Sequence, residues 1–179
     1  DITDTHGNHL DTGILGTRYL PDTLTDNGYG ENAFLIATQK TFPGWGYMVG
    51  QGATTLWERW EKITGDGMNS HNHIMLGSID AWFYRVIAGI RCGSPGWKHI
   101  VFKPPVFKDL HHASATLSTI AGVIAFYWKH AGNTFELNCT IPVGSGGEVH
   151  IPLLSKNPLI RENSVTIEPK DQPTGAEGV

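Results

Sequence analysis

The segment Gly-Ala-Thr-Thr-Leu-Trp-Glu-Arg-Trp at residues 52–60 carries the residue types best suited to chemistry. It places the carboxylate of Glu58 between Trp57 and Trp60, behind a glycine-rich stretch. Hydrolysis of a glycosidic bond needs one carboxylic acid that protonates the leaving oxygen and a second carboxylate that acts as nucleophile or activates water. Glu58 is therefore a candidate for one member of such a pair.

The same segment also fits a structural role. Thr55 and Glu58 have the spacing of a capping box, in which the two side chains satisfy backbone N–H groups at the start of a helix. Such a cap contributes about 1 kcal/mol to stability. From the pattern alone the cap is the favoured interpretation, and Trp57 and Trp60 are more typical of a core than of a sugar platform.

A second polar segment, at residues 70–78, precedes the clearest helical pattern. His71, Asn72 and His73 lie where the free backbone N–H groups of a helix start can meet the hydroxyls of a ligand. Two such histidines without a third ligand nearby are a weak metal signal, so we predict no metal site. Spacing alone favours capping or surface positions, with sugar contact as the alternative.

Trp45 and Tyr47 lie in a third segment, at residues 41–48, between glycines. Aromatic rings in a glycine-rich loop can form a wall on which a sugar stacks. Packing of Trp45 beneath the loop is the alternative.

Composition narrows the class of protein. Of 179 residues, 40% are hydrophobic and 17% are charged, as in folded proteins. A net charge of −4 without a Lys/Arg cluster argues against a nucleic-acid partner, and no apolar run approaches the roughly 20 residues of a membrane span. We predict neither partner and no cofactor, and the sequence does not indicate a compartment. The chain begins with Asp1 and shows no signal-peptide pattern, which resembles the inside of a longer polypeptide.

The pattern changes from helical to extended near Pro95. Apolar residues at intervals of three and four predict a helix over 74–90. Further helices are expected over 31–40, over 53–60 and after Thr12, the last kinked or ended near Leu20 by Pro21. Short apolar stretches between turn residues predict strands at 99–102, 113–117, 123–128, 134–141, 149–153 and 164–167. The tail from Lys170 is expected to fray.

So few helices cannot close a large helical barrel. We therefore expect residues 1–94 to be the C-terminal part of a larger helical domain or a helical cap, and residues 95–179 to be a β-sandwich domain.

Taken together, these segments resemble the C-terminal region of bacterial α-L-rhamnosidases of glycoside hydrolase family 78. The resemblance covers roughly residues 9–105 and is specific in its combination and order. It rests on His-Leu-Asp-Thr-Gly-Ile-Leu-Gly-Thr at 9–17, Pro-Gly-Trp-Gly-Tyr at 43–47, the segment at 52–60, Asn-His at 72–73, Ala-Trp-Phe-Tyr-Arg at 81–85, Ala-Gly-Ile at 88–90, Pro-Gly-Trp-Lys-His-Ile at 95–100 and Lys-Pro at 103–104.

The resemblance implies the last helices of an (α/α)6 catalytic barrel followed by an antiparallel β-sandwich, in an enzyme that releases terminal α-L-rhamnose with inversion. It places the family's general base on Glu58 and a rhamnose-contacting histidine on His73. Trp45, Tyr47, Trp57 and Asn72 are weaker candidates for substrate contact. The implied partners are a rhamnose-containing glycoside or oligosaccharide and the remainder of the barrel.

The sequence also departs from the family pattern. The general acid and most sugar-binding carboxylates of the family lie on earlier helices, so this chain carries the base without the acid and is expected to be inactive alone. His71 stands where an apolar residue is expected, Ile74 where an aromatic is common, and Pro21 interrupts a helix that is usually unbroken. The alternatives are a non-catalytic carbohydrate-binding fragment, a structural fragment, or a barrel glycosidase with another sugar preference.

Overall fold

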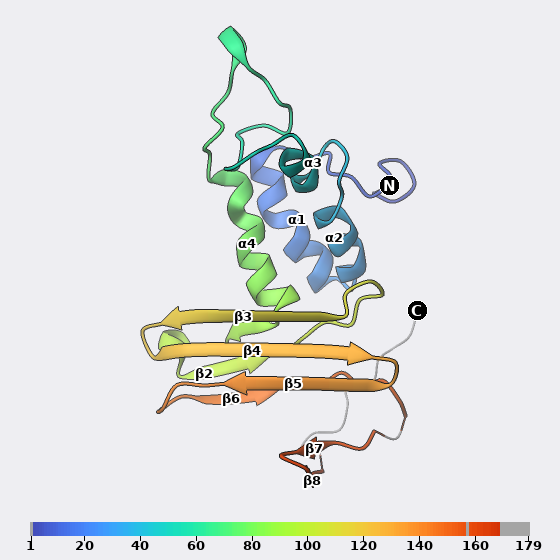
Figure 1. Cartoon of the computed structure of the whole chain (residues 1–179), viewed down its shortest axis with the longest axis vertical. Coiled ribbons are helices and arrows are strands. Elements are labelled where there is room, and N and C mark those ends of the chain that lie inside the picture. Colours follow the sequence, from blue (N-terminus) through green and yellow to red (C-terminus); the bar gives the residue numbers. More distant parts are fainter. Residues whose placement is uncertain (1, 157, 169–179) are drawn as a thin grey trace.

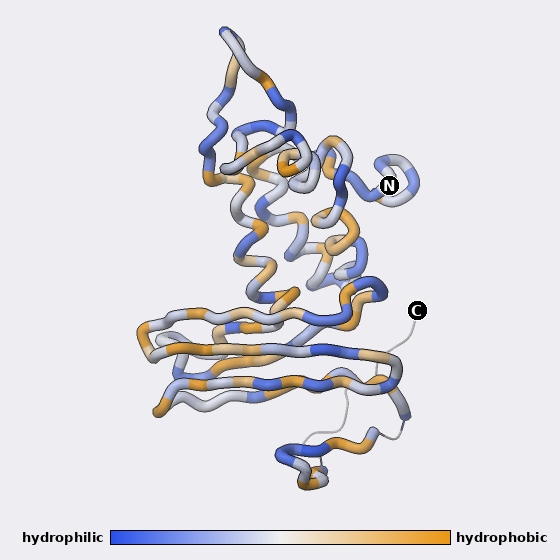
Figure 2. The backbone as a smooth tube through the Cα atoms, viewed as in Figure 1, coloured by the Kyte–Doolittle hydropathy of each residue, from blue (hydrophilic) through white to orange (hydrophobic). Residues whose placement is uncertain are grey.

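A computed structural model describes residues 2–156 and 158–168 and shows a helical part stacked on a β-sandwich (Figure 1). The helical part contains α1 (Ile14–Asp26), α2 (Gly30–Ala37), α3 (Trp45–Gly50) and a short 3-10 turn, η1 (Gly65–Gly67). It ends with a continuous helical run made of η2 (Met75–Gly77), α4 (Ser78–Trp82) and the π-helical η3 (Phe83–Ile87). Hydrophobic residues recur along the helices and strands (Figure 2).

The sequence predicted that Pro21 kinks the first helix or ends it near Leu20. The helix does not end there, because it continues through Pro21 to Asp26. Pro21 is buried, and the residues after it have tertiary partners that keep them helical. The indole N–H of Trp82 donates to Thr25 Oγ1 at 3.0 Å. The guanidinium of Arg85 donates to both carboxylate oxygens of Asp22. These contacts offset the backbone hydrogen bond that a proline inside a helix removes.

The helix predicted over 74–90 is present but shorter and of mixed type. Of the apolar positions predicted for it, Ile79, Trp82 and Val86 are buried, whereas Phe83 is exposed. Leu76, which the predicted pattern did not include, is fully buried. The run tightens at its start and widens into a π turn at its end, where the Ala88 N–H donates to the Phe83 carbonyl at 2.7 Å. Ile90 already belongs to a strand, because Gly89 takes a positive φ of 82° and turns the chain into the sheet.

Of the other helix predictions, one is confirmed and one is wrong, and one helix was not predicted. The helix expected over 31–40 is α2, which begins at Gly30 and ends at Ala37. The segment 45–50, expected to be loop, forms α3. The helix expected over 53–60 does not form, and these residues are irregular. None of the helices in the described part of the chain is long and apolar enough to cross a membrane.

The sandwich consists of two three-stranded sheets (Figure 1). One has the order β1-β2-β6, and the other has the order β3-β4-β5 with antiparallel pairing throughout. β1 and β2 are antiparallel, whereas β2 and β6 are parallel. A 3-10 turn, η4, precedes β2, and a hairpin of β7 and β8 follows the sandwich. The bounds are β1 (Ile90–Cys92), η4 (Pro95–Trp97), β2 (His99–Phe102), β3 (His112–Thr119), β4 (Gly122–Ala131), β5 (Thr134–Thr140), β6 (Gly146–Val149), β7 (Arg161–Glu162) and β8 (Val165–Thr166).

The core of the sandwich follows the alternation of strand residues. Ile124, Phe126 and Trp128 on β4 are fully buried or nearly so, and they face Ile100 and Phe102 on β2. The rings of Phe102 and Phe126 lie 4.7 Å apart between centroids. This alternation confirms the predicted strands at 99–102, 113–117, 123–128 and 134–141.

The last predicted strands were placed less well. The strand expected at 149–153 lies earlier, as β6, in a stretch whose glycines suggested a turn. Gly147 packs so closely on β2 that a Cβ there would lie 3.2 Å from the Ile100 carbonyl oxygen. The strand expected at 164–167 is the short β8. The tail from Lys170 lies outside the described residues, and the domain boundary near residue 95 stays a prediction.

Several contacts among the described residues fasten the helical part to the sandwich. The Trp128 indole N–H donates to the Ile87 carbonyl at 3.0 Å, at the end of the helical run. The Lys108 N–H donates to the Glu31 carboxylate, at 3.0 and 3.2 Å from its two oxygens. Phe107 packs on α2, with its ring centroid 5.6 Å from that of Phe34. The two parts therefore share packing as well as chain connectivity.

Candidate functional site

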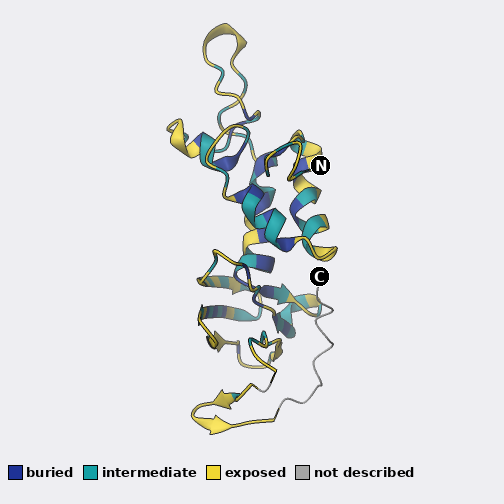
Figure 3. Ribbon diagram, turned by 90° about the vertical axis from the view of Figure 1, so that its right-hand side faces the viewer, coloured by how far each residue is buried: buried dark blue, intermediate teal, exposed yellow. Residues whose placement is uncertain are grey.

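Glu58 lies in an irregular segment that pairs with another irregular segment. The Glu58 N–H donates to the Ser70 carbonyl at 2.8 Å, and the His73 N–H donates to the Leu56 carbonyl at 2.8 Å. We call residues 55–58 and 70–73 the Glu58 clip. The clip closes the base of a loop that runs from 59 to 69 and projects from the helical part (Figures 1 and 3). Pairing between the two segments replaces the helix that local sequence predicts.

The carboxylate of Glu58 is held by the clip and does not cap a helix. Its Oε2 accepts a hydrogen bond from the Ser70 N–H at 3.1 Å, and its other oxygen has no hydrogen bond within the described ranges. The hydroxyl of Thr55 donates to the His71 carbonyl and not to a backbone N–H near Glu58. The capping-box interpretation is therefore wrong. A half-buried carboxylate fixed through one oxygen keeps the other available to a ligand or a water molecule.

Two indole rings anchor the segment on either side of Glu58. Trp57 is 3% exposed. The Trp60 indole N–H donates to the Thr12 carbonyl at 3.0 Å, and its ring meets that of Trp45 edge-on with centroids 5.1 Å apart. The structure thus places both rings in the helical core. They fix the chain immediately before and after the carboxylate.

Asn72 and His73 lie on the opposite segment of the clip. His73 is half-buried and Asn72 is exposed, and the Asn72 N–H donates to the Ser70 hydroxyl at 3.2 Å. Neither residue opens a helix, because the helical run starts at Met75 without a side-chain cap. The clip therefore brings Glu58 and His73 onto neighbouring segments, although their order in sequence suggested two separate helix starts.

Trp45 and Tyr47 lie on α3, beside the clip. The Trp45 indole N–H donates to the Leu76 carbonyl at 3.0 Å, and the ring is 9% exposed. Tyr47 is half-buried and meets Phe42 edge-on at 5.4 Å. An open groove of about 600 Å³ runs along this side, lined by Trp45, Leu56, Ile74, Gly77, Ile79, Asp80 and Phe83. Trp45 is therefore mainly packed beneath the loop, although it also contributes to the lining of the groove.

Sequence reasoning did not assign Thr55 or Ser70 to this site, and it considered the His71 side chain only as a cap, a surface residue or a sugar contact. Their contributions are a hydroxyl, a backbone N–H and a ring face that act between segments more than ten residues apart. No local pattern signals such contacts. Over residues 2–156 and 158–168, no group of three or more His, Cys, Asp and Glu side chains is arranged to hold a metal ion.

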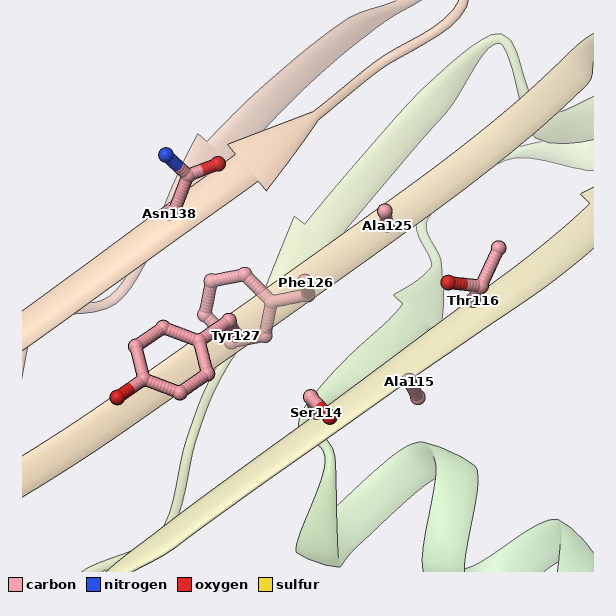
Figure 4. A pocket seen from close by; sticks show the side chains of 7 residues that line it. All are labelled: Ser114, Ala115, Thr116, Ala125, Phe126, Tyr127 and Asn138. Atoms are coloured by element: carbon pink, nitrogen blue, oxygen red, sulfur yellow. The ribbon is translucent and has the colours of Figure 1, made fainter.

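A second hollow lies on the outer face of the β3-β4-β5 sheet, at the other end of the molecule (Figures 1 and 4). It has a volume of about 400 Å³. Tyr127 stands between its cross-strand neighbours Ser114 and Asn138, and Thr116 and Ala125 form the next row. The hollow is shallow and has no charged residue in its lining, so it offers no carboxylate for the hydrolysis of a glycosidic bond.

Comparison with known proteins places this arrangement in a family. Residues 1–87 match the model of the bacterial alpha-L-rhamnosidase 6-hairpin glycosidase domain, and residues 89–165 match the model of the bacterial alpha-L-rhamnosidase C-terminal domain. The chain belongs to the bacterial α-L-rhamnosidase family. Its fold is accordingly part of a six-hairpin glycosidase domain followed by the family's C-terminal β-sandwich domain.

Several alpha-L-rhamnosidases are similar to this chain. A structure of alpha-L-rhamnosidase from Dictyoglumus thermophilum matches 93% of it at 54% identity, with a TM-score of 0.89. An alpha-L-rhamnosidase from Streptomyces avermitilis is 40% identical over 150 residues, which are 80% of this chain. A crystal structure of a Streptomyces avermitilis alpha-L-rhamnosidase complexed with L-rhamnose matches 84% of it at 38% identity, with a TM-score of 0.78.

This rhamnosidase chain spans only a small part of the length of its relatives. It covers 15% of the Streptomyces avermitilis protein and 19% of the Dictyoglumus thermophilum structure. The two family models together include both parts, since the first covers the clip within residues 1–87 and the second covers the sandwich within residues 89–165.

Proposed function

We propose that this chain is part of an inverting α-L-rhamnosidase and supplies its general base, Glu58. The observation that carries the proposal is the geometry of the clip, which holds one carboxylate oxygen of Glu58 on the Ser70 N–H and leaves the other without a partner in the described part of the chain. A base that activates water needs a fixed carboxylate with an accessible oxygen. The Glu58 side chain meets both conditions.

In this proposal the sugar lies against the clip. His73, on the segment facing Glu58, orients the rhamnose through its hydroxyls, with Asn72 as a further polar contact. Trp45 and Tyr47 border the substrate, and Trp57 acts from beneath as a support for Glu58. The relative solved with L-rhamnose supports a rhamnose-containing glycoside or oligosaccharide as the substrate.

The reaction proceeds by direct displacement. A general acid outside this chain protonates the departing glycosidic oxygen, while Glu58 takes a proton from a water molecule that attacks the anomeric carbon from the opposite face. In inverting enzymes the two carboxyl groups stand roughly 6.5–9.5 Å apart, which leaves room for this water. No cofactor enters the reaction.

The second partner is the remainder of the catalytic barrel. Large apolar side chains on the helical part are exposed, including Leu15, Tyr19, Val49 and Ile74. Exposed apolar surface of this kind marks an interaction site. We propose that the other barrel helices cover it, and that this chain alone is inactive because it lacks the acid.

The decisive test is Glu58→Gln in the full-length enzyme. The amide keeps the shape of the side chain but cannot take a proton, so kcat for an aryl α-L-rhamnoside is expected to fall by about 10²–10⁴-fold. Rhamnose binding, measured by calorimetry, is retained. Glu61→Gln is the matched control, because Glu61 is exposed on the same loop and its variant keeps wild-type turnover. Unchanged turnover of Glu58→Gln would remove the base from this position.

A further inference from the structure

His71 combines three features that no assigned role explains. Its carbonyl accepts a hydrogen bond from the hydroxyl of Thr55, on the other segment of the clip. Its ring stacks on the indole of Trp57, with centroids 5.0 Å apart and planes inclined by 26°. Its Nε2 is buried and has no hydrogen-bond partner among the residues that the structure describes.

The Trp57–His71 stack occupies the middle of the clip. On one side of it is the Glu58–Ser70 pair, and on the other is the pair formed by Leu56 and His73. Ser70, which precedes His71, holds the Glu58 carboxylate through its N–H. Trp57 precedes Glu58 in the same way. The two stacked residues are thus the chain neighbours of Glu58, which carries the carboxylate, and of Ser70, which holds it.

The surrounding structure gives the clip little other support on this side. Residues 53–74 form no α-helix or β-strand, and few hydrogen bonds join the two segments of the clip. Segments of this kind open locally at low free-energy cost unless side-chain packing closes them. Trp57 is almost fully buried, so the imidazole stacked on it is anchored to the helical core.

We propose that His71 is a positioning residue for Glu58, and that it acts through the face of its ring and not through its nitrogen atoms. The inference rests on the proposed role of Glu58 as general base. The stack holds Ser70 in place, and Ser70 in turn fixes the orientation of the carboxylate. A buried nitrogen without a partner contributes nothing favourable, so an aromatic ring of similar width without that nitrogen serves equally well.

The test compares His71→Ala with His71→Phe in the full-length enzyme. His71→Ala removes the ring, and a misplaced base lowers kcat for an aryl α-L-rhamnoside by about 10–100-fold. The KM changes by less than about threefold, because the sugar contacts lie on other residues. His71→Phe restores the stacking surface, and kcat returns to within about threefold of wild type with an unchanged pH–rate profile. His112→Ala is the control: this histidine is exposed on β3, and its loss leaves turnover unchanged.

Each outcome decides the matter. If kcat of His71→Ala stays within about threefold of wild type, the stack does not position the base. If His71→Phe is as impaired as His71→Ala, the nitrogen matters and the inference is overturned. Should His71→Ala fail to fold, impaired turnover of His71→Phe would still overturn the inference. The Glu58→Gln variant separates the two levels, because its full activity would refute the base itself, whatever the His71 variants show.

Discussion

Gly89 offers a sharp test of how the helical part is joined to the sandwich. It has a φ of 82° between the end of η3 and the start of β1. A Cβ at this position would lie 2.8 Å from the carbonyl carbon and oxygen of Lys103 and from the nitrogen of Pro104. The neighbouring backbone cannot withdraw, because the Lys103 N–H donates to the Gly89 carbonyl at 2.8 Å.

Gly28 supplies the matched control for this position. Its φ is 85°, and a Cβ there would meet no atom within 4 Å. Gly28→Ala therefore carries the left-handed backbone strain without the clash. That strain is about 1–2 kcal/mol, reduced by the lower entropy of the unfolded Ala chain, for a net loss of about 1 kcal/mol. Gly89→Ala adds an overpacking cost of about 1–3 kcal/mol, for a total of about 2–4 kcal/mol.

Urea denaturation of this chain, followed by far-ultraviolet circular dichroism, measures both losses. The midpoint of Gly89→Ala should fall well below that of Gly28→Ala at an unchanged denaturant slope. Equal losses of unfolding free energy in the two variants would refute the argument that close backbone approach, in addition to backbone conformation, requires glycine at the junction.

Two further predictions concern the sandwich. Trp128→Phe leaves the Ile87 carbonyl without its donor and creates a small cavity, so the unfolding free energy should drop by about 2–4 kcal/mol. The control is Trp97→Phe, at a half-buried ring with no side-chain hydrogen bond in the described structure, and its unfolding free energy should drop by less. The hydrogen bond from His150 lowers the pKa of the Glu148 carboxyl below its ordinary 4.5. The stability that wild type gains over Glu148→Gln is therefore fully present above pH 4.5 and is lost as the pH falls through the lowered pKa. Unfolding curves of both proteins between about pH 3 and pH 7 measure this difference. A difference in unfolding free energy that does not change with pH would contradict the prediction.

Several features of the protein follow from local sequence. The apolar spacing over 74–90 predicted a helix with one buried face, and Ile79, Trp82 and Val86 of that pattern are buried, although Phe83 is exposed. The short apolar stretch at 123–128 likewise predicted a strand, and it lies within β4. Such patterns are readable because burial imposes the period of the secondary structure on the residue types. The family, too, was recognisable from short motifs in order.

Tertiary structure decided the features that depend on partners distant in the chain. The capping-box spacing of Thr55 and Glu58 predicted a helix, but backbone groups of residues 70–73 supply the hydrogen bonds that a helix would have made. Pro21 stays inside α1 because Arg85 and Trp82, some sixty residues later, hold the second half of that helix. β6 pairs in parallel with β2, where two glycines suggested a turn.

The candidate site shows the same division. Sequence determined that Glu58 is a carboxylate between two tryptophans and that His73 follows an asparagine, and the family resemblance made them candidates for catalysis. Only the folded chain placed the two on facing segments, buried Trp57 under them and stacked His71 on it. The physical reason is that a local pattern reflects the residues' own conformational preferences, whereas the position of a carboxylate depends on hydrogen bonds and ring contacts between segments that only tertiary folding brings together.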